Sequence, residues 1–197
     1  EVTVAPYGGQ HEGSTRRPFR VLIVGSGLTG CLTALRIRQR LHDCQQPPSS
    51  NHHFDLTVVE RATYPAGRFG ATATYRGCVA DIGAQVLSTI NPKDPRALGG
   101  HGVTVEDIRT SSDIVQALTS DGTISRVMGS TLGETEERML WEGLWQHYSA
   151  PRGLVSVLRK LLLWATARTQ FGVRVDSLSV DNDSMIQVKG VQRIETK

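Results

Sequence analysis

A glycine-rich turn between a strand pattern and a helix pattern places the strongest constraint on this fold. Phe19 to Val24 is a short apolar run rich in β-branched residues, typical of a buried parallel strand. The residues that follow it read Gly25-Ser26-Gly27-Leu28-Thr29-Gly30. Beyond the turn, apolar residues recur at spacings of three and four, which predicts a helix over about Gly27 to His42.

A second strand is predicted from Phe54 to Val59, and it ends at Glu60. A strand, a helix and a strand at this spacing form a βαβ unit, whose crossover is nearly always right-handed and whose strands are parallel. The sequence therefore predicts an α/β fold with a central parallel sheet. The polar stretch from Gln45 to His53 is expected to be the loop between the helix and the second strand.

Weaker patterns predict the remaining elements. We expect short strands at Ala71 to Tyr75 and Gly77 to Ile82, a helix at Asp107 to Leu118, and a strand within Met139 to Tyr148. A strong helix starts at Pro151, and its wide apolar face predicts burial of Leu154, Val155, Leu158, Leu161, Leu162 and Ala165. The segments Val173 to Val180 and Met185 to Val188 are expected to form a hairpin.

Composition excludes several classes of protein. The net charge is +3 and aromatic residues make up 6%, too few for a basic, aromatic nucleic-acid surface. No apolar run approaches the ~20 residues of a transmembrane helix. The three cysteines are widely spaced and match neither a disulfide framework nor a zinc site, so a reducing compartment is the simpler interpretation. Cys31 is expected to be a small core residue.

The glycine turn has the chemistry of a dinucleotide site. Gly25 permits the tight turn, Gly27 carries no Cβ to obstruct a pyrophosphate, and Gly30 lets the helix approach the strand. The amides and the partial positive charge of the helix N-terminus attract phosphate. The alternative is a glycine turn with a structural role alone.

Glu60 is the candidate ribose ligand. Such sites place a carboxylate at the end of the second strand, ~20 residues after the turn, where it accepts hydrogen bonds from ribose hydroxyls. Glu60 lies further along, and the long loop before Phe54 accounts for the difference. A carboxylate here disfavours a 2′-phosphate. The alternative is that Glu60 is a solvated strand end.

The chain resembles the flavin-containing amine oxidase superfamily, and most closely the renalase family, from Phe19 to about Val188. The resemblance is carried by residues 21–30, Val58-Val59-Glu60, Gly67-Arg68, Asp81-Ile82-Gly83-Ala84-Gln85 and Ala150-Pro151-Arg152-Gly153. It implies a Rossmann-type FAD-binding fold with a central parallel sheet and part of a second, smaller region. It also implies that no acid–base pair need be visible, because the flavin supplies most of the chemistry.

The resemblance assigns further cofactor contacts. Gly67 would let the backbone pass close to FAD, and Arg68 would contact the pyrophosphate side, although Ala66 stands where the family has a glycine. Gly83, Ala84 and Gln85 would pass near the flavin ring, and Val175 near the adenine. The alternatives are a surface arginine at 68 and ordinary packing at the other positions. The full set of expected cofactor contacts is Gly25, Ser26, Gly27, Leu28, Thr29, Gly30, Glu60, Arg61, Gly67, Arg68, Gly83, Ala84, Gln85 and Val175.

We expect four regions: a leader over residues 1–18, a Rossmann-type core over 19–90, a variable insertion over 91–150, and a helix with a hairpin over 151–197 that returns to the nucleotide-binding domain. Full chains of the family are longer and add a sheet-based substrate domain. The leader is expected to be disordered or processed. The expected location is intracellular and soluble, either cytoplasmic or, after processing, organellar such as mitochondrial.

The resemblance implies an FAD-dependent oxidoreductase that oxidises a reduced nicotinamide nucleotide or an amine and passes the electrons to oxygen. Two alternatives stay open. The chain could be a degenerate flavoprotein fold that has lost FAD and serves as a subunit of a larger assembly, or it could be an NAD-dependent dehydrogenase. No nucleic-acid partner and no metal are expected. His52 and His53 lie in a polar loop without a partner at metal-ligand spacing.

Overall fold

The structure is a computed structural model that describes residues 19–44, 54–65, 67–76, 78–84, 86–91, 93, 104–127, 145–180 and 186–192. The chain divides into two compact units. Unit 1 contains Glu1–Arg68 and Leu158–Lys197, and unit 2 contains Phe69–Val157. Unit 2 is thus an insertion in the crossover that leads from the second strand of unit 1 to its third.

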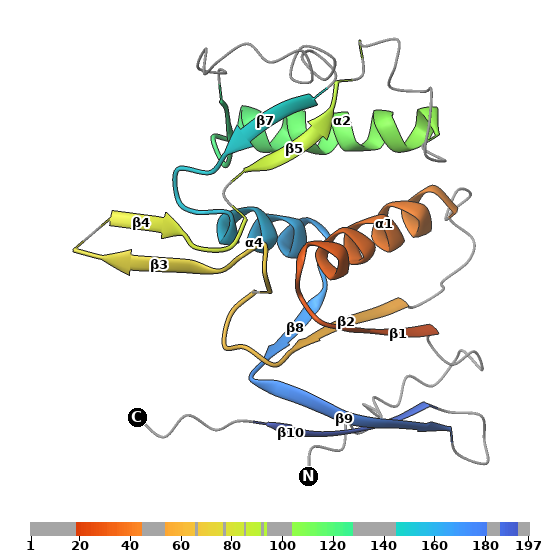
Figure 1. Ribbon diagram of the computed structural model, residues 1–197. Coiled ribbons are helices and arrows are strands. Elements are labelled where there is room, and N and C mark those ends of the chain that lie inside the picture. Colours follow the sequence, from red (N-terminus) through yellow and green to blue (C-terminus); the bar gives the residue numbers. More distant parts are fainter. Residues whose placement is uncertain are drawn as a thin grey trace. The chain divides into compact units, whose positions relative to one another are not determined.

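A parallel sheet is the centre of unit 1. It contains β1 (Phe19–Val24), β2 (Phe54–Glu60) and β8 (Arg168–Phe171) in the order β1-β2-β8. Phe19 pairs with Phe54, and Thr57 pairs with Arg168, both in parallel register (Figure 1). The prediction of a central parallel sheet is therefore confirmed.

Burial differs sharply between the two predicted strands. Leu56, Val58 and Val59 of β2 are almost fully buried, because β2 has a strand on each side. Val24, the last residue of β1, is 56% exposed. Arg20 is also exposed, and Val21 to Ile23 are only half-buried, so the prediction of a buried first strand is wrong, since β1 pairs only with β2 among the described residues.

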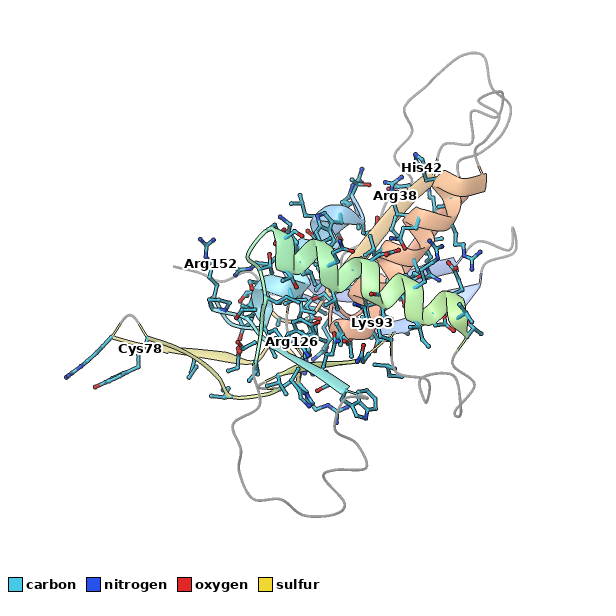
Figure 2. All side chains as sticks on the ribbon, turned by 90° about the horizontal axis from the view of Figure 1, so that it is seen from above. Arg38, His42, Cys78, Lys93, Arg126 and Arg152 are labelled. Carbon is cyan, nitrogen blue, oxygen red and sulfur yellow. The ribbon has the colours of Figure 1, made fainter. Side chains whose placement is uncertain are left out.

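The helices α1 (Leu28–Cys44) and α4 (Val155–Trp164) lie on one side of this sheet, and the antiparallel pair of β9 (Val173–Val180) and β10 (Ile186–Gln192) lies on the other (Figure 1). The helix α1 spans Leu28–Cys44, close to the predicted bounds, and buries Cys31, Ala34 and Leu35. Arg38 of α1, seen in Figure 2, donates from Nε to the carbonyl of Ala165, just past the end of α4. The arginine thus satisfies a carbonyl that the end of the helix leaves without an intrahelical donor.

The helix α4 (Val155–Trp164) confirms the predicted helix, but the predicted start at Pro151 is wrong, because the helix begins four residues later at Val155. All six residues of that face are buried within the chain: Leu154, Val155, Leu158, Leu161, Leu162 and Ala165. The neighbouring Leu163 is 67% exposed, which marks the solvent side of the helix.

The hairpin near the C-terminus is confirmed, with a longer second strand than predicted. β9 (Val173–Val180) pairs antiparallel with β10 (Ile186–Gln192), and a register shift falls between Lys189 and Gly190. A Cβ at Gly190 would overlap the carbonyl oxygen of Arg174, so this position accepts only glycine without a local shift.

The described residues of unit 2 include two antiparallel sheets, the helix α2 and the start of α4. The predicted short strands are present as the hairpin of β3 (Thr72–Tyr75) and β4 (Cys78–Asp81), with Cys78 exposed near its tip (Figure 2). A second sheet has the order β5-β7-β6, formed by β5 (Leu87–Ile90), β6 (Ser125–Arg126) and β7 (Trp145–Ser149). The strand predicted within Met139 to Tyr148 corresponds to β7; residues 139–144 lie outside the described part.

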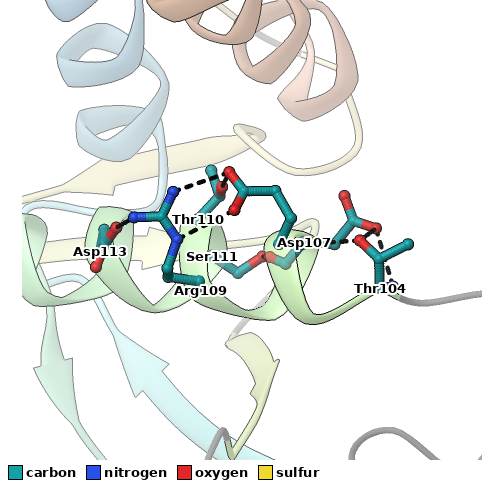
Figure 3. A network of polar contacts seen from close by, with 7 residues as sticks. Thr104, Asp107, Arg109, Thr110, Ser111 and Asp113 are labelled. Atoms are coloured by element: carbon teal, nitrogen blue, oxygen red, sulfur yellow. Dashed lines mark hydrogen bonds and ion pairs between the residues drawn. The ribbon is translucent and has the colours of Figure 1, made fainter.

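The helix α2 spans Val105–Ser120 and begins two residues before the predicted start. A capping box sets this start: the Asp107 amide donates to Thr104 Oγ1 at 3.1 Å, and the Thr104 amide donates to Asp107 Oδ2 at 3.1 Å. Arg109 adds a bidentate contact to Glu106 and lies 3.9 Å from Asp113 (Figure 3). The Thr-x-x-Asp spacing that marks this start is visible in the sequence.

The unit boundaries fall at other positions than the expected region boundaries. The compact units separate after Arg68 and after Val157, whereas the sequence places divisions after residues 90 and 150. The hairpin of β3 and β4, expected in the core, is part of unit 2. Within the described part of the chain, no helix is long and apolar enough to cross a membrane.

Thr166 supplies a test of the backbone at the end of α4. It follows the helix with φ +47°, a left-handed conformation that is unfavourable for a β-branched residue by about 1–2 kcal/mol. We expect Thr166→Gly to raise the free energy of unfolding by about 1 kcal/mol, because glycine adopts this conformation without strain.

Thr33→Gly is the control, since Thr33 is exposed in the interior of α1. Glycine there should lower stability by about 0.3 kcal/mol. Urea unfolding of the three proteins measures both changes, and a destabilised Thr166→Gly variant would contradict the assignment of strain.

Candidate dinucleotide-binding site

The glycine turn joins β1 to α1 at the carboxyl end of the parallel sheet. Gly25 has φ +101°, and its amide donates to the carbonyl of Val59 in β2 at 2.8 Å. At the start of the helix, the Cys31 amide donates to the Gly27 carbonyl at 3.0 Å. The amides of the first helical turn therefore have no acceptor within the helix. They point out of its N-terminus, which is the geometry of an anion site.

Gly30 is the point of closest approach between α1 and the turn. A Cβ at Gly30 would overlap the carbonyl oxygen of Gly25 and would lie 3.5 Å from Cγ2 of Ile23. The structure thus gives the third glycine the packing role that its place in the motif predicts. By contrast, a Cβ at Gly25 meets nothing within 4 Å, so it is the positive φ that requires glycine there.

Gly67 lies beside the glycine turn, although it is 40 residues after Gly27 in the sequence. Its φ is +83°, and a Cβ built there would lie 3.6 Å from the Cα of Gly27. Gly67 and Arg68 are both exposed. The structure therefore brings two of the sequence-predicted segments together, while Ala66 lies outside the described residues.

Glu60 is bonded to the turn through its side chain. Its Oε2 accepts both the Ser26 amide at 2.8 Å and the Ser26 hydroxyl at 3.0 Å, and its Oε1 accepts the Ala62 amide at 2.9 Å. Ser26 is completely buried and Glu60 is half-buried. The carboxylate is thus a bridge between the end of β2 and the glycine turn.

Two opposing effects act on the pKa of Glu60. Burial raises it, but hydrogen bonds from the amides of Ala62, Ser26 and Arg61 and from the Ser26 hydroxyl outweigh burial, so the pKa lies below its usual value. Glu60 is therefore an anion at neutral pH.

Cys31 is a neutral core residue at neutral pH. Burial first, and the charge of Glu60 second, raise the pKa of its thiol to about 12. Its Sγ donates to the Ser26 carbonyl at 3.2 Å, so the thiol anchors the turn and is not a nucleophile.

The other predicted contacts are distributed over both units. Leu28 is half-buried and Thr29 exposed in the first turn of α1, and Arg61 is exposed directly after Glu60. Val175 is half-buried in β9, where it pairs with Gly190. Gly83 and Ala84 belong to unit 2, where the Gly83 amide donates to the Ala71 carbonyl at 3.2 Å. Gln85 lies outside the described residues.

Asp81 has a role that the sequence analysis missed. Both of its carboxylate oxygens accept the Leu154 amide, at 3.0 and 3.1 Å, directly before the start of α4. A carboxylate at a helix N-terminus is favourable for the exposed amides and for the helix dipole. Two segments that carry the family resemblance, 81–85 and 150–153, are therefore tied together locally within unit 2.

Comparison with known proteins supports the fold. Residues 23–98 match the family described as the NAD(P)-binding Rossmann-like domain. With the β1-β2-β8 sheet and the glycine turn, this match confirms the predicted α/β fold of the Rossmann type. No curated protein matches the chain.

Several solved structures are similar to this chain at low identity. An oxidoreductase from Methanosarcina mazei is 14% identical, with a TM-score of 0.46 over 91% of this chain and 57% of its own. NikD, an amino acid oxidase of nikkomycin biosynthesis, is 16% identical, with a TM-score of 0.43 over 87% and 48%. PqsL, a probable FAD-dependent monooxygenase from Pseudomonas aeruginosa, is 17% identical, with a TM-score of 0.44 over 88% and 38%. The chain thus spans about half the length, or less, of most of these proteins.

Among the described residues, no group of three or more His, Cys, Asp or Glu side chains gathers as a metal site. The polar chemistry of the site is that of backbone amides and one carboxylate. Such an arrangement can bind and orient an anionic ligand that also carries hydroxyl groups.

Replacement of Gly30 tests the packing of the turn. Gly30→Ala is expected to lower the free energy of unfolding by about 2 kcal/mol or more, because its Cβ meets a backbone oxygen that cannot rotate away. Gly67→Ala is the matched comparison. Its Cβ meets only an ordinary contact, so the positive φ alone should lower stability by about 1 kcal/mol.

Urea unfolding of the chain without ligand measures both variants. Equal losses in the two proteins would mean that Gly30 has no special packing role.

The lowered pKa of Glu60 predicts how stability depends on pH. The folded pKa lies below the unfolded one, so the ionised carboxylate contributes stability above the unfolded value near 4.5, and this is lost as the pH falls through the folded value. Glu60→Gln removes this contribution. We expect the variant to be less stable than the wild type at pH 7, and the difference to shrink steadily below pH ~4.5.

Thermal unfolding of both proteins between pH 7 and pH ~3 measures the difference, and the other carboxylates cancel in the comparison. A difference that stays constant over this range would show that the Glu60 hydrogen bonds do not depend on its charge.

Proposed function

We propose that the glycine turn and Glu60 bind the adenosine diphosphate half of a dinucleotide, and that this dinucleotide is FAD. The enzyme would be a renalase-like oxidoreductase that oxidises a reduced nicotinamide nucleotide or an amine and transfers the electrons to oxygen. One observation carries the proposal: Glu60 is held as an anion against the glycine turn, at the carboxyl end of the sheet. In open α/β sheets, ligands bind at this end of the strands.

The residues present fit a pyrophosphate. The space around Gly25 is open, because a Cβ there would meet no atom within 4 Å. The amides of the first turn of α1 precede the helix's own hydrogen bonds, so they can donate to phosphate oxygens. Gly27 and Gly67 approach each other without side chains, which leaves the backbone accessible from both segments.

The charge of Glu60 favours a ribose with free hydroxyls. An ionised carboxylate accepts hydrogen bonds from hydroxyl groups and repels a phosphate at the same place. The site therefore suits FAD or NAD better than NADP. Arg61, directly after Glu60, is exposed, whereas the Glu60 carboxylate is the side chain bonded to the glycine turn.

Gly67 supports FAD over NAD. The family resemblance assigns a second glycine-arginine segment to the FAD site, and Gly67 does lie beside Gly27. When bound, FAD supplies the acceptor for a hydride or electron pair. The residues of this chain would hold its phosphates and its adenosine ribose, with Arg68 on the pyrophosphate side and Val175 near the adenine.

A second candidate is an NAD-dependent dehydrogenase, favoured by the match of residues 23–98 to an NAD(P)-binding domain. A third is a flavoprotein fold without cofactor that serves as a subunit of an assembly. The absorption spectrum of the purified chain distinguishes the first from the others, since bound oxidised flavin absorbs near ~370 and ~450 nm. Calorimetric titration with FAD and NAD then separates the second candidate from the third.

Replacement of Gly27 tests the place of the pyrophosphate. Gly27→Val puts a branched side chain where the phosphate would approach, so we expect FAD affinity to fall about a hundredfold or more. Gly122→Val is the control, because a Cβ at Gly122 meets nothing within 4 Å and the residue lies in the turn after α2; its φ of +74° strains a valine, so the control carries at least the folding cost of a branched side chain.

Titration with FAD and circular dichroism of both variants provide the measurement. Full FAD affinity in a folded Gly27→Val protein would assign the glycine turn a structural role alone.

A further inference from the structure

The hydrogen bonds of Glu60 leave little room for a ribose. An ionised carboxylate has about four acceptor positions, two on each oxygen. On Oε2, both are filled by Ser26, through its amide at 2.8 Å and its hydroxyl at 3.0 Å. On Oε1, the Ala62 amide fills one at 2.9 Å. The Arg61 amide makes the smallest contribution to the lowered pKa of Glu60 and forms no hydrogen bond of normal geometry with it, so one position remains, on Oε1.

The backbone of Ser26 is fixed from several sides. Its amide is bonded to Glu60, its carbonyl accepts the Cys31 thiol at 3.2 Å, and the preceding amide, of Gly25, is bonded to Val59 at 2.8 Å. Ser26 is also fully buried. The hydroxyl is thus the one donor to Glu60 in this turn that can be removed without changing the course of the backbone.

We propose that the Ser26 hydroxyl is an internal competitor of the ribose, so that Glu60 binds a dinucleotide through only one of the two ribose hydroxyls. This inference rests on the proposed dinucleotide site and adds a specificity-determining residue to it. A free carboxylate would accept both vicinal hydroxyls. Here the serine occupies the second place, which stabilises the turn without ligand and weakens binding of the ribose.

The proposal predicts that Ser26→Ala lowers the stability of the free chain but raises its affinity for an adenosine diphosphate. Ser26→Ala removes the hydroxyl but keeps the amide bond, so the free chain should unfold at a lower temperature. The same change frees an acceptor position on Oε2. Affinity for an adenosine diphosphate should then rise about tenfold, the value of one charge-assisted hydrogen bond. A purely structural serine would lower both quantities.

The probes are ADP, 2′-deoxy-ADP and 3′-deoxy-ADP, titrated calorimetrically into the full 197-residue chain. With the wild type, removal of only one of the two hydroxyls should weaken binding, by about tenfold, and removal of the other should have little effect. With Ser26→Ala, removal of either hydroxyl should weaken binding.

Ser156→Ala is the matched control, because the Ser156 hydroxyl donates to the carbonyl of Gly153 at 2.7 Å, in unit 2. It should leave ADP affinity unchanged.

The outcomes separate this inference from the function on which it rests. If neither the wild type nor Ser26→Ala binds ADP, the dinucleotide site itself is wrong. If the wild type binds ADP but loses affinity with both deoxy analogues, two hydroxyls are bound together and the competition is wrong, although the dinucleotide site stands. Equal or weaker ADP binding by Ser26→Ala also overturns the competition. The titration of the wild type decides the question even if Ser26→Ala fails to fold.

Discussion

The close approach of Gly30 to the Gly25 carbonyl sets the geometry of the corner around the glycine turn. The absence of a side chain at Gly30 lets α1 begin directly on the turn that follows β1. Because the Gly25 amide is also bonded to Val59, the same turn is fixed to β2. The glycine turn, the start of α1 and the end of β2 therefore form one rigid corner, and Ser26 is completely buried within it.

The periodic elements of the fold could be predicted from the sequence, but β8 could not. The helices α1 and α4 and the strands β1, β2 and β9 carry strong apolar patterns, and their positions agree with the structure. By contrast, β8 reads Arg-Thr-Gln-Phe and has no pattern of its own. It is a strand because its backbone pairs with β2 from Thr57 to Glu60, and such pairing depends on a segment more than 100 residues away.

For the site, the residue types could be predicted from the sequence. The hydrogen bonds that these residues make with one another in the absence of a ligand could not. The glycine spacing and the position of Glu60 point to a dinucleotide from chemistry alone. That Glu60 is already bonded to Ser26, 34 residues away, depends on how the turn packs on β2. Likewise, Asp81 could be placed in a family segment, but its bond to the Leu154 amide appears only in the folded unit 2.

These same bonds resolve an electrostatic conflict in the proposed site. The Glu60 carboxylate is bonded to an amide inside the turn that would bind the pyrophosphate, so two anions would share one corner of the molecule. Donors that bind the carboxylate directly lower its charge density toward its neighbours. The Ser26 hydroxyl, Ser26 amide and Ala62 amide supply three such donors. A competitor for the ribose thus also reduces the repulsion of the phosphates, which gives a physical reason for a serine between the two glycines.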